Sequence, residues 1–330
     1  MGETERPRAD DGLRVTVGSK ARRYLIPLLI GAATVAGFVI VARRMAGGAV
    51  SEATSPDWLL LAGAFGVAAA VQPLRAFAWS QTLQRPVGFR AVYAASAVGS
   101  FLDTVLPGRL GEASKVAVLR VASGPRWPGV ARAGGSLLAA HLMEALAFCL
   151  VGATAGIFLP FPTWARAAVV GALTLAASGI AAAGIIHRHF NRWLPRWADK
   201  FLAAAAVPRP TLLRTIAILT ATWAVRWIGV LLTLNAVGVH ASLGAALLYM
   251  VLTGLANTAP LLPGNAGVYQ GAAVAALAMV GEAGSKAVAA SLVAPVLASV
   301  ATAAAALLGI ALFGRRFAEL PRAALSRARA

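Results

Sequence analysis

The sequence predicts an all-α polytopic membrane protein with about six transmembrane helices and two re-entrant helical hairpins in an inverted-topology repeat. The chain is 59% hydrophobic and 13% charged, with a mean hydropathy of +0.74, whereas a soluble domain is about half apolar and about a quarter charged. Its apolar stretches run to about 20 residues, enough to cross a bilayer, and lack the period-two alternation of barrel strands. Because only helices and closed barrels satisfy every backbone group in lipid, a helical bundle follows.

Six segments are long enough to span the membrane. They are residues 24–42, 57–78, 134–158, 166–187, 211–237 and 287–313. The first is longer than the apolar region of a signal peptide, so we predict that it is retained. We predict a single transmembrane domain over 21–315, flanked by a disordered basic cytoplasmic tail at 1–20 and a second basic tail at 316–330.

Two further apolar stretches are interrupted near their middle. Residues 91–122 and 243–281 are broken at Pro107-Gly108 and at Pro263-Gly264. Their arms of about 15 residues are too short to cross a bilayer, which predicts half-helices that enter and leave on one side. Two kinked full spans are the alternative, because Pro and Gly are common in membrane helices. The shared pattern L-P-G-x-x-G at both breaks favours the hairpins.

The distribution of positive charge orients the chain. The net charge is +18 with an isoelectric point near 11.7, but Lys and Arg occupy short loops and tails, which indicates a membrane protein and no nucleic-acid partner. Of the 30 Lys and Arg residues, 22 fall in segments on one side and four on the other. Both termini are therefore predicted to be cytoplasmic, and we predict that the repeats, approximately 21–160 and 161–315, are inverted, an arrangement in which the two hairpin tips could meet near the midplane.

Six charged side chains are predicted at membrane depth. They are Arg75, Asp103, Arg109, Glu112, Glu144 and Arg226. Each unpaired ion near the centre costs about 2.5–3.5 kcal/mol, so these groups must pair, face a wet cavity or bind a polar ligand. Three acids and three arginines could simply neutralise one another.

Local positions give some of these charges expected roles. Asp103 ends a half-helix, where the dipole disfavours an anion, so a cation such as Arg109 is expected beside it. Glu112 begins the returning half-helix, where the dipole stabilises an acid. Arg75 ends the second span, where snorkelling to the interface is the alternative, whereas Arg226 lies in the middle of the fifth. Both guanidinium groups suit a phosphate.

Neutral and titratable candidates complete the predicted substrate site. His141 and Glu144 lie three apart on one helix face and form either a titratable pair or an ordinary polar contact between helices. The second hairpin offers Asn257, Asn265, Tyr269 and Gln270 for hydrogen bonds to a headgroup. The single cysteine, Cys149, excludes an intrachain disulfide and a four-cysteine metal cluster, and we expect no metal and no cofactor.

A basic segment follows the fourth span. Residues 188–209 carry Arg188, Arg192, Trp193, Arg196, Trp197 and Lys200 at spacings of one to four residues. This pattern predicts an amphipathic helix on the inner leaflet, with Trp at the interface and cations near anionic lipid.

At the two breaks the sequence resembles the lysylphosphatidylglycerol synthase transmembrane-region family. The resemblance covers most of 20–315 and is most specific from Asp103 to Glu112, followed by Lys115. A second family element is similar to the segment with Pro263, Gly264, Asn265, Gly267 and Gln270. This chain departs from the family pattern at Asn265, at Gln270, and at His141 with Glu144.

The resemblance implies translocation of lipid between leaflets of a bacterial-type cell membrane. The implied partners are anionic or aminoacylated phospholipids or polyprenyl-linked lipids, and no segment resembles the aminoacyl-transferase domain of longer members. We therefore expect a flippase in which Arg109 and Arg226 hold phosphate, while Asp103, Glu112 and Glu144 pair with them or bind an amine.

Other classes of function stay open. A secondary transporter of a small polar solute or ion, or a non-catalytic membrane scaffold, would also explain the hairpins. An enzyme acting on a lipid phosphate would need a nucleophile with a base or a metal, and the sequence holds no such motif. The oligomeric state is open, a homo-oligomer included.

Overall fold

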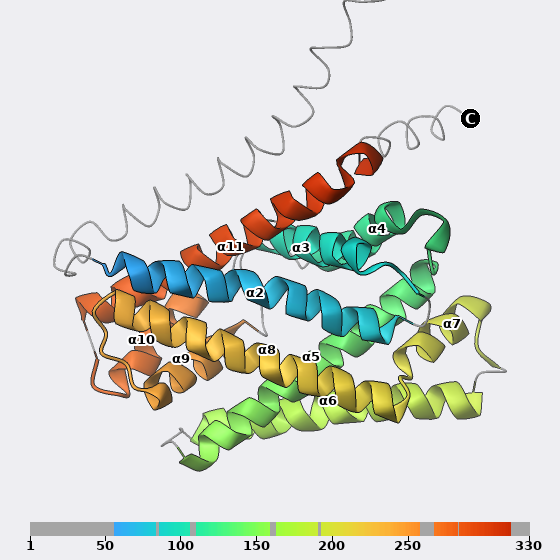
Figure 1. The fold of residues 1–330 in the computed structure, drawn as a ribbon. Helices are drawn as coiled ribbons and strands as arrows, with labels where there is room; N and C mark the ends of the chain where they lie inside the picture. The colour runs from blue at the N-terminus through green and yellow to red at the C-terminus, as the bar shows by residue number, and fades with distance from the viewer. Residues whose placement is uncertain are drawn as a thin grey trace, which may run out of the picture.

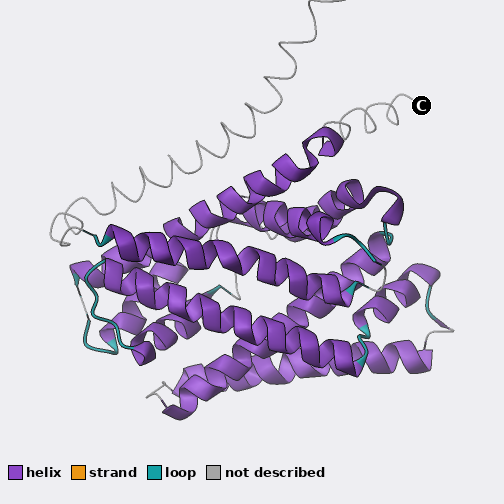
Figure 2. Ribbon diagram, viewed as in Figure 1, coloured by secondary structure: helices purple, strands orange, loops and turns teal. Residues whose placement is uncertain are grey.

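The computed structural model describes residues 56–83, 86–105, 110–158, 163–190, 193–257, 267–282 and 284–317, and these residues form helices joined by short loops, without a strand (Figures 1 and 2). The helices are α2 (Trp58–Thr82), α3 (Phe89–Val105), α4 (Leu110–Ser123), α5 (Val130–Phe158), α6 (Thr163–Phe190), α7 (Arg196–Ala205), α8 (Arg209–Ala236), α9 (Leu243–Ala256), α10 (Val268–Ala278) and α11 (Ser285–Phe317), with a 3-10 turn at Gly124–Arg126.

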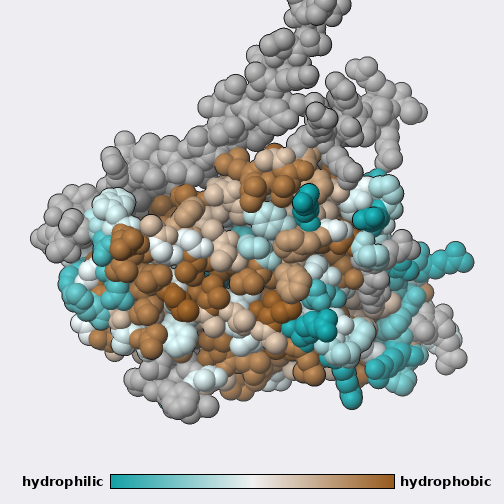
Figure 3. All heavy atoms as spheres, viewed as in Figure 1, coloured by the Kyte–Doolittle hydropathy of each residue, from teal (hydrophilic) through white to brown (hydrophobic). Residues whose placement is uncertain are grey.

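Within the described residues, five helices are long and apolar enough to cross a membrane. They correspond to α2, α5, α6, α8 and α11. Hydrophobic surface covers the middle of the molecule, with hydrophilic residues gathered toward its ends (Figure 3). The prediction of an all-α polytopic membrane protein is confirmed. The expected span at 24–42, the predicted tail at 1–20 and residues 318–330 of the predicted tail at 316–330 lie outside the described residues. Residues 316 and 317 of that tail belong to α11.

The helices α2 and α8 lie side by side through the bundle (Figure 1). Small residues let them approach: a Cβ on Gly229 of α8 would lie 3.0 Å from the Val67 side chain of α2. Each helix packs on the next helix of its own half, α2 on α3 and α8 on α9, and on the last span of the other half, α2 on α11 and α8 on α5. This reciprocity is what an inverted repeat requires, although the repeat itself stays a prediction.

The two interrupted stretches form two pairs of short helices, α3 with α4 and α9 with α10. The two pairs lie toward opposite ends of the bundle (Figure 1). Contact between α3 and α4 is close, because a Cβ on Gly111 would collide with the backbone nitrogen of Asp103. The Pro-Gly breaks, Pro107-Gly108 and Pro263-Gly264, lie outside the described residues. Re-entry into the membrane stays a prediction.

The largest apolar core lies where α5, α8, α9 and α10 meet. Tyr249, Met143 and Leu234 are fully buried in it. The Phe148 ring of α5 packs on Trp223 of α8 with centroids 4.8 Å apart, and Gly254 of α9 leaves room for that phenyl ring. This core fixes the position of α8, which carries Arg226.

The short helix α7 docks on α5 through a glycine. A Cβ on Gly135 of α5 would collide with the backbone carbonyl of Phe201 in α7. A backbone carbonyl cannot turn away as a side chain does, so only glycine allows this approach.

Replacing this glycine tests the packing. Gly135→Ala should force α5 and α7 apart and lower the stability by about 1–3 kcal/mol, measured as a lower thermal unfolding temperature in detergent. The matched control is Gly171→Ala in α6, where a Cβ meets nothing within 4 Å. Equal unfolding temperatures for the two variants would contradict the close contact.

Candidate functional site

A cavity of about 300 Å³ lies between α2, α8, α10 and α11. Its wall is mostly apolar and carries a few polar groups. The polar lining residues are Gln72, Arg75, Arg226, Thr233, Asn257, Tyr269, Gln270, Ser299 and Thr302. Five of the residues predicted from the sequence are among them: Arg75, Arg226, Asn257, Tyr269 and Gln270. An apolar pocket with a few converging polar groups is the usual form of a small-ligand site.

Arg75 connects the cavity to α5 through an ion pair. Its Nη2 lies 2.8 Å from Glu144 Oε2, and the two side chains are 28% and 19% exposed. A charge-assisted contact of this length offsets much of the cost of holding both ions in an apolar bundle. Glu144 therefore pairs with Arg75 across helices, whereas the sequence had placed it beside His141.

Arg226 brings a second guanidinium to the same cavity. Its Cζ lies 4.9 Å from the centroid of the Trp223 ring, a cation–π contact. Among the described residues, no carboxylate lies within ion-pair distance of Arg226. The cavity thus holds two cations and one acid at its edge, which favours an anion.

Gln72 adds an acceptor that lacks a partner. Its side chain is 5% exposed, and its Nε2 donates to Thr302 Oγ1 over 3.3 Å. Its Oε1 has no hydrogen-bond partner among the described residues. An unpaired buried acceptor costs about 1–3 kcal/mol, so a donor from a ligand or water is expected there. The sequence analysis missed this residue. The sequence does show a glutamine about one helical turn before Arg75 in a mostly apolar helix, and this pattern could have pointed to Gln72.

The α9 and α10 side of the cavity is neutral. The Gln270 Oε1 accepts from the backbone nitrogen of Gly267 over 2.6 Å and so caps the start of α10. Gly267 has a φ of 87°, which glycine adopts without strain. The Tyr269 hydroxyl lies 3.3 Å from the Tyr249 hydroxyl. This chain thus uses a neutral side chain as the cap of α10.

The other predicted charges gather in a separate cluster between α3, α4 and α5. Lys115, only 4% exposed, lies at its centre, with its Nζ 2.6 Å from Glu112 Oε1 and 3.8 Å from Asp103 Oδ2. His141 Nε2 lies 3.1 Å from Glu112 Oε2. The expected partner of Asp103, Arg109, lies outside the described residues, and so does Asn265.

The hydrogen bonds of His141 show when it pairs with Glu112. Its Nδ1 lies 2.8 Å from the Leu137 carbonyl, so Nδ1 carries a proton and donates it. Nε2 then carries a proton only in the imidazolium form. Glu112 Oε2 lacks any other donor in the described structure. The contact is therefore an ion pair when His141 is protonated and an unfavourable contact when it is neutral.

Comparison with known proteins identifies the family of the chain. Residues 25–309 match the family described as the lysylphosphatidylglycerol synthase TM region. No curated protein and no solved structure matches the chain.

The Arg75–Glu144 pair is testable by a double-mutant cycle. Arg75→Met and Glu144→Met should each lower the unfolding temperature in detergent, because each leaves one ion unpaired. The double variant should recover stability, with a coupling energy of about 0.5–3 kcal/mol. Additive losses would show that the two side chains do not interact.

Proposed function

Because the chain belongs to the lysylphosphatidylglycerol synthase TM region family, we propose that it is a flippase that moves a phospholipid or isoprenoid-linked phospholipid headgroup between leaflets. The observation that carries the proposal is the cavity with Arg75, Arg226 and the unpartnered Gln72 Oε1. Guanidinium groups bind phosphate oxygens, and an amide oxygen accepts from an amine or hydroxyl. A headgroup that carries both groups fits this site.

The position of the cavity supports transport by alternating access. It lies between α2 and α8, the counterparts in the two proposed repeats, and reaches α10 and α11 of the second half. Inverted-repeat transporters bind substrate at the repeat interface, beside interrupted helices. A rocking motion of one repeat on the other would expose the same two arginines to each side in turn. We place this transporter in the cell membrane with both termini in the cytoplasm, following the bias of Lys and Arg.

The cavity volume of about 300 Å³ suits a headgroup and not a whole lipid. The acyl chains would stay in the bilayer while the headgroup passes between helices. The charged cluster around Lys115 lies apart from the cavity lining, so we assign Asp103, Glu112 and His141 no direct substrate contact in this conformation. The proposed activity is transport without covalent chemistry.

Arg226 should be required for flipping. Arg226→Gln should slow translocation about 10–100-fold, since a hydrogen bond to a charged group contributes about 1.5–3 kcal/mol. The measurement is a proteoliposome assay in which an impermeant reagent reports headgroup accessibility. The control is Arg214→Gln, which removes an exposed arginine of the same helix that does not line the cavity. Equal rates for all three proteins would contradict the assignment.

Gln72 should select headgroups that donate hydrogen bonds. Gln72→Leu should slow the translocation of phosphatidylethanolamine about 2–10-fold. The translocation rate of phosphatidylcholine should be nearly unchanged, because its quaternary ammonium has no hydrogen-bond donor. The control is Thr233→Val, because the Thr233 hydroxyl lines the cavity but donates to the Gly229 carbonyl. Equal slowing of both lipids would contradict this role. Uptake of soluble glycerophosphoethanolamine without lipid flipping would instead indicate a solute transporter.

A further inference from the structure

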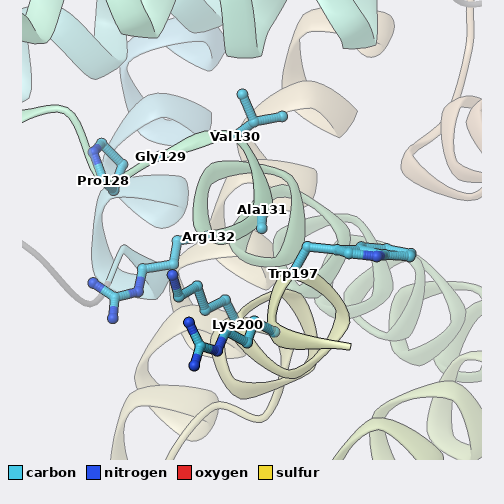
Figure 4. A pocket seen from close by; sticks show the side chains of 8 residues that line it. Pro128, Gly129, Val130, Ala131, Arg132, Trp197 and Lys200 are labelled. Atoms are coloured by element: carbon cyan, nitrogen blue, oxygen red, sulfur yellow. The ribbon is translucent and has the colours of Figure 1, made fainter. Parts of the chain in front are cut away.

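A second pocket, of about 580 Å³, lies between the start of α5 and the helix α7 (Figure 4). Three of its lining residues are cations, Arg132, Arg196 and Lys200, and none of the acids in the described part of the chain lines it. Arg132 and Lys200 extend to the same side of the pocket, whereas the Trp197 ring extends to the opposite side (Figure 4). Three positive charges without a counter-charge predict an anionic ligand.

The nearest acid of α7 does not neutralise these cations. Asp199 Oδ1 lies 3.2 Å from His187 Nδ1 of α6 and does not line the pocket. The contact of Gly135 with Phe201 holds α7 against α5, so the cations from the two helices are kept together. The fold therefore fixes the backbone positions from which the three cations extend into the pocket.

Exposed apolar side chains beside the cations identify the surroundings of the pocket. Trp197 is 67% exposed, Trp193 78% and Val130 64%. Tryptophan beside Lys and Arg at the end of a membrane span is typical of the lipid–water interface. A nucleic acid or an acidic protein would match the charge but not these apolar groups.

The same end of the bundle carries most of the described loop cations. Arg90, Arg120, Arg126, Arg188 and Arg209 lie at helix ends on this side, against Arg166 and Lys286 on the other. By the positive-inside rule this end faces the cytoplasm, where the leaflet surface is negative.

We propose that Arg132, Arg196 and Lys200 form a binding site for the phosphate of an anionic phospholipid of the cytoplasmic leaflet, with Trp197 at the interface beside it. This site is separate from the transport cavity and does not depend on the proposed flipping. Its cations come from α5 and α7, and α5 also holds the Glu144 partner of Arg75. A bound lipid would thus bridge α7 to the helix that supports the cavity.

Native mass spectrometry of the full chain in detergent tests the site, with phosphatidylglycerol and phosphatidylcholine as probes. All proteins carry Arg226→Gln, which removes the cavity arginine that has no carboxylate partner among the described residues and leaves only Arg75, held by Glu144. Failure of the flipping proposal therefore leaves the result readable. We expect preferential retention of phosphatidylglycerol. Arg132→Gln, Arg196→Gln and Lys200→Gln together should weaken it about tenfold or more, given the attraction of each cation for an anionic surface. Arg209→Gln, outside the pocket, should not.

Two further measurements keep the test decisive. Arg132→Lys with Arg196→Lys preserves the charge and should preserve binding, which separates loss of charge from loss of folding. When the pocket residues are unchanged, rising salt should weaken the binding of phosphatidylglycerol to the protein, because salt screens charged contacts at a surface. Equal retention of the two lipids, salt-insensitive binding, or an unaffected triple variant would overturn the proposal. Displacement of phosphatidylglycerol by equimolar inorganic phosphate would indicate a phosphate ion site instead.

Discussion

Holding charge inside an apolar helical bundle is the constraint on which the rest of this structure depends. An ion near the bilayer centre costs about 2.5–3.5 kcal/mol unless it finds a partner. Arg75 meets this constraint through Glu144, and Lys115 meets it through Glu112 and Asp103. Each pair except Lys115–Glu112 joins two helices, so the ion pairs also fix which helices are neighbours. Arg226 lies against the Trp223 ring and has no carboxylate within ion-pair distance among the described residues, which leaves its guanidinium available to a ligand.

Close helix packing lets these charges meet. Gly99 of α3 faces the Lys115 side chain of α4 so closely that a Cβ there would collide with it, and Gly111 faces Asp103 in the same way. A larger residue at either position would separate α3 from α4 and stretch the contacts around Lys115. Gly111, the second glycine of the L-P-G-x-x-G element, therefore allows the close contact on which the charged cluster depends. In α5, Gly135 allows α7 to approach closely, which brings the cations of the pocket together.

The sequence predicted the helices well because membrane thickness and apolar length determine them together. The span expected at 211–237 is observed as Arg209–Ala236, and that at 287–313 as Ser285–Phe317. Partners were harder to predict, because they depend on neighbours from distant parts of the chain. Spacing placed His141 beside Glu144 on one helix face, yet the two side chains turn to Glu112 and to Arg75. Gln72 was missed because the sequence does not show whether a single amide in an apolar helix has its hydrogen bonds satisfied. The structure shows that its Oε1 has no partner among the described residues.

The two arginines of the cavity are not equivalent, and the difference bears on turnover. A transported group must bind well enough to enter and weakly enough to leave. Arg226 is open to an incoming phosphate, whereas Arg75 is already held at 2.8 Å by Glu144. A phosphate that recruits Arg75 must therefore compete with a carboxylate, which weakens its binding and returns Arg75 to a stable partner when it leaves. If both arginines lacked partners, the empty cavity would be unstable and the bound phosphate would be retained. The single acid at the cavity edge thus keeps binding reversible, and it does so from the middle of α5, the helix whose start lines the cationic pocket.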